Sequence, residues 1–124
     1  MLADPDIDIS AIARSAGTRR PYAAGDVIFR EGDPADFVYV VLSGAVEIDH
    51  EGRTIETIGP GKALGILSVL DERPRTVTAV MRLPGEIAAV DPRRFRFMVE
   101  EVPGFVWYVM GELAHRLRAT NAAL

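Results

Sequence analysis

Short β-rich segments alternate with turn signals along residues 19–91, and this alternation limits the chain to a small set of folds. Glycine, proline and aspartate separate the segments, as in Gly25-Asp26 and Pro84-Gly85. Strands that recur about every 8–12 residues favour an antiparallel barrel or sandwich, whose sheet edges are protected by closure or by covering helices. The β-rich segments are 27–29, 37–42, 45–49, 54–58, 76–82 and 86–90.

Helical patterns flank the β-rich region on both sides. Residues 7–17 carry apolar side chains at helical spacing and end at Gly17. Asp91-Pro92 suits an N-cap followed by the first helical residue, and Pro103 is expected to begin the last helix in the same way. We therefore predict one mainly β domain over residues 1–124, an antiparallel β-barrel of the jelly-roll (double-stranded β-helix) type. Its parts are an N-terminal helix at 7–17, the barrel at 19–91 and two C-terminal helices at 92–124.

Composition excludes several classes of function. The chain has 124 residues, no cysteine and only two histidines, His50 and His115. We therefore expect no metal site, no catalytic triad or dyad, and no enzyme. A net charge of −4 argues against direct binding to DNA. The acidic N-terminus lacks the order of a signal peptide, and apolar runs stay below the ~18 residues that a membrane span needs, so we expect a cytoplasmic protein.

The last helix carries a heptad pattern of its own. Apolar residues at alternating spacings of four and three allow two helices to pack side by side. We predict a homodimer through this helix, with another face of the helix covering the barrel. The alternative is that the whole stripe packs on the chain's own barrel. The stripe consists of Val106, Met110, Leu113, Leu117, Thr120 and Leu124.

The segment 59–79 has the features of an anion-binding site. A glycine-rich turn ending at Gly65 leads into a short apolar segment, and a loop then supplies Arg75. Arginine offers a planar fork of donors to phosphate oxygens. The alternative for Arg75 is an ordinary solvated loop residue.

The order of these features resembles the cyclic nucleotide-binding domain. Segments 22–33 and 37–48 look like its first strand pairs, and 59–79 looks like its phosphate-binding cassette. The family includes catabolite activator-type bacterial regulators, regulatory subunits of protein kinase A and cyclic-nucleotide-gated channels. The resemblance covers about residues 7–124. It rests on spaced glycines at Gly25, Gly32, Gly44, Gly61 and Gly65.

The resemblance implies a ligand and the residues that bind it. Gly65 and Leu67 match the glycine and aliphatic positions of the cassette, and Arg75 and Thr76 match the phosphate-binding arginine and the small residue after it. Ile66 stands where the family has a glutamate that holds the ribose 2′-hydroxyl, so the cassette is degenerate at this position. Loss of a charge-assisted hydrogen bond, worth roughly 1.5–3 kcal/mol, predicts weakened binding of cyclic AMP or cyclic GMP. The full set of cassette positions that we assign to the ligand is Gly65, Ile66, Leu67, Ser68, Arg75 and Thr76.

The end of the last helix adds two candidate ligand contacts. Thr120 and Asn121 fall where catabolite activator-type regulators place polar contacts to the purine, one from each subunit. The alternative is a frayed polar helix end. In those regulators a DNA-binding helix-turn-helix follows, so the chain is either a free-standing sensor or a fragment.

Two functions remain open at this point. The first is a regulatory domain that binds a cyclic nucleotide, or a related anionic ligand, through Gly65–Thr76 and signals through the C-terminal helices. The second is a degenerate barrel that serves as a dimerisation or interaction module without a nucleotide. Ile66 favours the second, whereas Gly65, Arg75 and Thr76 favour the first.

Overall fold

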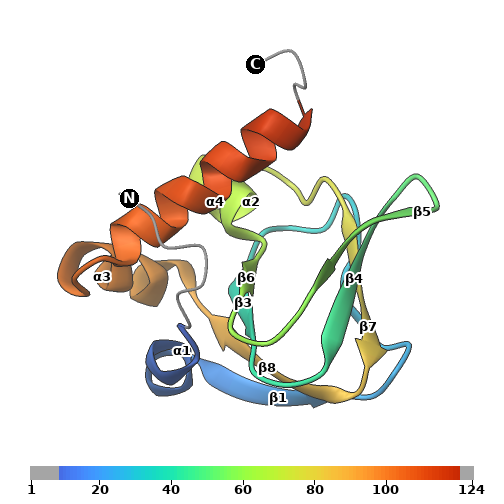
Figure 1. The fold of residues 1–124 in the computed structure, drawn as a ribbon, viewed down its shortest axis with the longest axis horizontal. Helices are drawn as coiled ribbons and strands as arrows, with labels where there is room; N and C mark the ends of the chain where they lie inside the picture. Colours follow the sequence, from blue (N-terminus) through green and yellow to red (C-terminus); the bar gives the residue numbers. More distant parts are fainter. Residues whose placement is uncertain (1–8, 121–124) are drawn as a thin grey trace.

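Two four-stranded antiparallel sheets form the centre of the molecule in the computed structural model, which describes residues 9–120 (Figure 1). One sheet has the strand order β1-β8-β3-β6 and the other β2-β7-β4-β5. This is the predicted mainly β, jelly-roll architecture with one N-terminal and two C-terminal helices. The strands are β1 (Thr18–Tyr22), β2 (Val27–Phe29), β3 (Val38–Val41), β4 (Ala45–His50), β5 (Arg53–Ile58), β6 (Ala63–Leu64), β7 (Thr78–Leu83) and β8 (Gly85–Val90).

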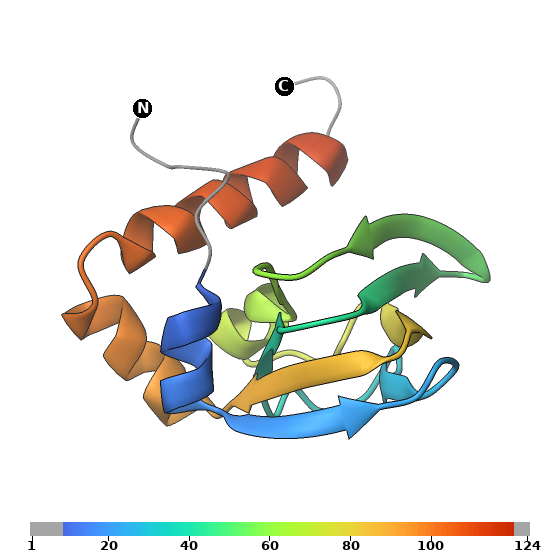
Figure 2. The same cartoon turned by 60° about the horizontal axis from the view of Figure 1, so that its bottom comes forward.

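The longer helices gather on one side of the sheets (Figure 2). They are α1 (Ser10–Ala16), α3 (Pro92–Glu101) and α4 (Phe105–Thr120), while the short α2 (Ile66–Asp71) lies beneath α4 in both views. Gly17 ends α1, as expected, and donates its backbone N–H to the Ala13 carbonyl at 2.8 Å. Asp91 caps α3 by accepting a hydrogen bond from the Arg94 N–H at 2.8 Å, with Pro92 in the first helical position.

The core has two parts, and the central strands contribute to both. Side chains alternate along a strand, so Tyr39 and Val41 of β3 face the other sheet while Val38 and Val40 face the helices. The second part, which we call the helical layer, fills the space between the sheet and the helices. Its buried members include Ile9, Ala13, Ile66, Phe95, Met98, Phe105, Tyr108 and Val109.

Three predicted details differ from the structure. The last helix begins at Phe105 rather than at Pro103, because the Phe105 N–H bonds to the Val102 carbonyl in a turn that precedes α4. Strand β1 was not expected, since Thr18–Tyr22 contains two arginines and Pro21. It occupies a sheet edge, where proline is tolerated. The two-residue strand β6 is too short to produce a sequence pattern.

The outer surface of α4 is exposed at three of the six positions of the predicted stripe. Val106, Met110 and Leu117 are exposed, whereas Leu113 packs partly against the helical layer. The alternative in which the whole stripe packs on the chain's own barrel is therefore wrong for these residues. Leu124 lies outside the described residues, as does Ile7 at the start of the predicted N-terminal helix.

Candidate functional site

Gly65 and Arg75 meet at the edge of the sandwich, beside the first turn of α2. Gly65 has a φ of +81°, a conformation in which a side chain would be strained. A Cβ atom at this position would also overlap Arg75 Nη1. That same Nη1 donates a hydrogen bond of 2.8 Å to the Gly65 carbonyl. Glycine at position 65 therefore allows both the positive φ of the turn into α2 and the close approach of the Arg75 guanidinium.

The Arg75 guanidinium is buried, with only 3% of the residue exposed. Its Nη2 donates to the Phe37 carbonyl, and its Cζ lies 4.3 Å from the centre of the Phe29 ring. Arg75 Nε is buried without a hydrogen-bond partner among the described residues. The alternative of an ordinary solvated loop arginine is thus wrong.

The charge of Arg75 lacks a close counterion in the described part of the chain. Within residues 9–120 no carboxylate lies at ion-pair distance from it. Burial lowers the pKa of Arg75, and Tyr39, Asp36 and Asp33 oppose that shift electrostatically. Burying a charge without an ion-pair partner is costly. An anion in contact with Arg75 would offset this cost.

The loop between β2 and β3 fixes the backbone of Arg75. The Gly32 N–H donates to the Arg75 carbonyl, and the Arg75 N–H donates to the Asp33 carbonyl, both at 2.8 Å. Together with the Phe37 carbonyl, these bonds connect the loop to both the main chain and the side chain of Arg75. The arginine is therefore positioned by a segment about 40 residues away in the sequence.

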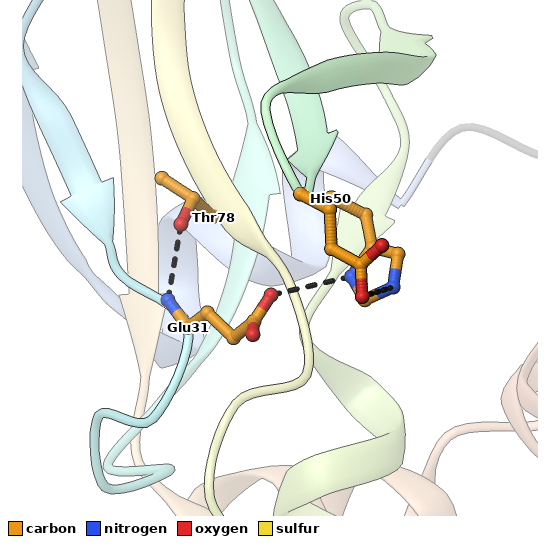
Figure 3. Close-up of polar contacts among 4 residues, drawn as sticks. Glu31, His50 and Thr78 are labelled. Atoms are coloured by element: carbon orange, nitrogen blue, oxygen red, sulfur yellow. Dashed lines mark hydrogen bonds and ion pairs between the residues drawn. The ribbon is translucent and has the colours of Figure 1, made fainter.

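Polar contacts at Glu31 connect that loop to the second sheet (Figure 3). The Glu31 N–H donates to Thr78 Oγ1 at 3.1 Å, at the start of β7. The Glu31 carboxylate lies 3.2 Å from His50 Nδ1, at the end of β4. These exposed contacts connect the loop to β7 and β4, and none of the three residues lines the pocket described next.

The six cassette positions within Gly65–Thr76 predicted from the sequence all line one pocket. The pocket is small, with a cavity volume of about 50 Å³, and it opens to solvent. Apolar side chains from both sheets form much of the wall, together with one residue of α4. The lining residues are Phe29, Ile48, Leu64, Gly65, Ile66, Leu67, Ser68, Arg75, Thr76, Val77 and Arg116.

The cassette residues differ in what remains available to a ligand. Ile66 is 4% exposed and belongs to the helical layer as well as to the pocket wall. The buried Ser68 hydroxyl donates to the Pro74 carbonyl at 3.4 Å. Leu67 and Thr76 are exposed at the pocket. An isoleucine thus occupies the position at which the resemblance implies a carboxylate.

Arg116 is a pocket residue that the sequence analysis did not identify. It lies on α4, four residues before Thr120, which is the separation that places two residues on the same face of a helix. That spacing is the signal that could have identified it. Thr120 is the last residue of α4, and Asn121 lies outside the described residues, so their contact with a base stays a prediction.

Two other features are absent from the part of the chain that the structure describes. Residues 9–120 contain no group of three or more histidine and acidic side chains that could hold a metal ion. None of the helices there is long and apolar enough to cross a membrane.

Comparisons with known proteins agree with this geometry. The family model described as the cyclic nucleotide-binding domain matches residues 19–102. The cyclic AMP receptor protein of Thermus thermophilus is 33% identical over 128 aligned positions, covering 99% of this chain and 58% of the relative. A CRP-like cAMP-activated global transcriptional regulator of Mycobacterium tuberculosis is 30% identical, covering 93% of this chain and 54% of the relative.

A solved structure extends the likeness to three dimensions. The catabolite activator protein of Thermus thermophilus superposes with a TM-score of 0.81 at 30% identity, covering 98% of this chain and 60% of that one. The chain therefore spans a little more than half the length of these regulators. The matched family model, the shared fold and the position of Arg75 lead to one conclusion: the chain belongs to the cyclic nucleotide-binding domain family, with regulators of the catabolite activator type among its relatives.

Proposed function

We propose that residues 1–124 act as one regulatory, non-catalytic sensing domain in the cytoplasm, and that its cassette binds the phosphate of a cyclic nucleotide. The observation that carries the proposal is the buried Arg75 guanidinium, which has a hydrogen-bonding atom without a partner and no ion-paired carboxylate in the described region. An anionic phosphate supplies both missing partners. The names of the relatives, a cyclic AMP receptor and a cAMP-activated regulator, make cyclic AMP the first ligand to test, and cyclic GMP is the second.

The proposal extends to how occupancy is communicated. Helix α4 lies over α2 and contributes Arg116 to the pocket wall, so a ligand can favour one arrangement of the C-terminal helices over another. Thr120, the last residue of α4, and Asn121, which lies outside the described residues, are assigned to the purine. The exposed apolar surface of α4 is assigned to a second copy of the chain.

Titration calorimetry with cyclic AMP and cyclic GMP tests the binding site. We expect Arg75→Ala to weaken binding by about 100-fold, because a buried charge-assisted contact to phosphate is lost. The matched control is Arg73→Ala, since Arg73 is exposed and lies outside the pocket lining. Arg75→Lys retains the positive charge without the planar fork of donors. This variant serves as the test if the alanine variant does not fold. Binding that survives Arg75→Ala contradicts the proposal.

A second ligand pair tests the role of Ile66. Because isoleucine cannot accept a hydrogen bond from the ribose, we expect cyclic AMP and its 2′-deoxy analogue to bind within about twofold of each other. A preference of about tenfold or more for cyclic AMP would show that another group has replaced the family glutamate.

The alternative function is an interaction module without a nucleotide. Two observations favour it: Ile66 packs into the helical layer, and apolar side chains are exposed along α4. This alternative predicts a dimer whose stability does not change when cyclic AMP or cyclic GMP is added. Ligand-dependent stabilisation of the wild-type protein, absent in Arg75→Ala, would exclude it.

A further inference from the structure

Residues 30–33 form a closed turn next to Arg75. The Asp33 carboxylate accepts a hydrogen bond of 2.9 Å from the Arg30 N–H, and the Asp33 N–H donates to the Arg30 carbonyl at 3.0 Å. Gly32 has a φ of +90°, which lets the chain reverse within so few residues. Because these bonds make the turn one unit, its attachment to the rest of the fold also sets the position of the groups that it presents to Arg75.

Both backbone and side-chain hydrogen bonds connect this turn to the segment that carries Arg75. The backbone bonds are those of Gly32 and Asp33 to Arg75, both 2.8 Å long. The side-chain bond is the one in which Thr78 Oγ1 accepts the Glu31 N–H at 3.1 Å (Figure 3). We propose that Thr78 is a positioning residue for Arg75, and that its hydroxyl raises the affinity of the pocket for phosphate. The inference rests on the proposed function, because it concerns the same binding site.

Thr78 extends the connection between β2 and β7 beyond the last pair of their ladder. The register of the two strands ends with Phe29 opposite Ala79, and position 78 lies between that pair and Arg75. Here the Glu31 N–H bonds to a hydroxyl in place of a backbone carbonyl. A backbone bond tolerates almost any residue, whereas this one requires a side chain with an acceptor. The identity of residue 78 therefore matters to the attachment of the turn.

The main-chain position of Arg75 matters because backbone carbonyls orient its guanidinium. Nη1 donates to the Gly65 carbonyl at 2.8 Å, and Nη2 donates to the Phe37 carbonyl. Nε is buried without a hydrogen-bond partner among the described residues. Hydrogen bonds weaken steeply as their angle departs from linearity, and a guanidinium binds phosphate through the direction of its donors as well as its charge. A turn that is less firmly attached would therefore present Arg75 less precisely to a phosphate.

A purely local role for Thr78 makes a different prediction. Thr78 does not line the pocket, so any effect of its hydroxyl on a ligand has to pass through residues that do. If the hydroxyl only stabilises the start of β7, its removal lowers the stability of the protein and leaves ligand affinity unchanged. If the hydroxyl positions Arg75, its removal weakens binding only while the arginine is present.

The experiment measures the affinity for cyclic AMP and cyclic GMP by titration calorimetry, in the wild-type and Arg75→Ala backgrounds. Thr78→Val removes the hydroxyl and keeps the β-branched shape. We expect it to weaken binding by about three- to tenfold in the wild-type background, because one positioning hydrogen bond is lost. In the Arg75→Ala background we expect a change within about twofold, since residues that act together are not additive. If Arg75→Ala binds too weakly to titrate, Arg75→Lys supplies the second background, because lysine lacks the planar fork.

Two further variants separate the hydroxyl from other effects of the substitution. Thr78→Ser keeps the acceptor and is expected to bind within about twofold of the wild type. Thr57→Val is the matched control, since Thr57 is exposed on β5 and lies outside the pocket lining. It is expected to leave the affinity unchanged.

Amide hydrogen exchange measures the position of Arg75 without a ligand. The Arg75 N–H is bonded to the Asp33 carbonyl, so a turn that opens more often exposes this amide. We expect about three- to tenfold faster exchange at Arg75 in Thr78→Val than in the wild type.

Three results would overturn the inference alone, provided that binding still depends on Arg75. They are an unchanged affinity in Thr78→Val, an equal loss in both backgrounds, and unchanged exchange at the Arg75 amide. Failure of the wild-type protein to bind cyclic AMP or cyclic GMP would overturn the proposed function and this inference together.

Discussion

Helix α4 has two apolar faces with opposite surroundings. Phe105 is 2% exposed and packs in the helical layer, with its ring centre 5.8 Å from that of Phe95 and 6.0 Å from that of Tyr108. Trp107, two residues later, is 41% exposed, and Met110 is 51% exposed. The comparison shows that hydrophobicity identifies the residues that can be buried, while the packing partners determine which of them are buried within the chain.

The largest expected effect concerns the inner face. Phe105→Ala should lower the free energy of unfolding by about 3–5 kcal/mol, because it leaves a cavity among buried aromatic side chains. Trp107→Ala is the matched control on the outer face and should cost the isolated chain less than about 1 kcal/mol. Urea unfolding at low protein concentration measures both values. Similar losses for the two variants would contradict the assignment of inner and outer faces.

The second prediction uses pH to probe the inner face. Burial raises the pKa of Tyr108 to about 12, although its hydroxyl also accepts a hydrogen bond of 2.9 Å from the Ala63 N–H. In the unfolded chain a tyrosine ionises near pH 10, so the neutral hydroxyl favours the folded state. This contribution is fully present below pH 10 and is lost as the pH rises towards 12, for a total of about 2–3 kcal/mol.

Urea unfolding at a series of pH values between 9 and about 12 measures that loss. Tyr108→Phe is the control, because it removes the ionisable group. The variant should be less stable at neutral pH, since the Ala63 N–H loses its acceptor, and should show a smaller decline at high pH. Burial also raises the pKa of Tyr39, which leaves a residual slope in the variant. Parallel pH profiles for the two proteins would contradict the assignment.

The smallest expected effect on the fold, and the most direct test of the outer face, is Met110→Glu. The side chain is exposed in the single chain, so unfolding of the isolated subunit should change by less than about 1 kcal/mol. If the outer face binds a second copy, a buried carboxylate there is costly and the variant becomes a monomer. Light scattering at high micromolar concentration measures the mass. A wild-type monomer under these conditions would contradict the proposed dimer.

Much of the fold was accessible from the sequence because its signals are local. Predicted segments such as 27–29, 45–49 and 86–90 correspond to β2, β4 and β8, and Asp91-Pro92 marked the start of α3 correctly. Strand β1 was missed because an edge strand with Pro21 need not show apolar alternation. The start of α4 was predicted two residues early, because a proline just before the helix gives the same signal as a proline in the first helical position.

The candidate site was predictable only in the part that is continuous in sequence. Gly65 and Arg75 were identified by their spacing, and the structure brings them into contact. Arg116 was missed because it lies more than 40 residues away and reaches the pocket only when α4 packs over α2. The same holds for the Phe37 carbonyl that accepts a hydrogen bond from Arg75.

The sequence by itself determined the family, most of the order of strands and helices, and the arginine at the centre of the candidate site. Those properties depend on periodicity, turn residues and short-range spacing, which can be read directly from the order of the residues. Only the tertiary structure decided that Arg75 is buried without a close counterion in the described region, that Ile66 packs in the helical layer, and that a second arginine lines the pocket. The burial of a side chain and the pairing of its charge depend on which distant segments come into contact. Those contacts exist only in the folded chain.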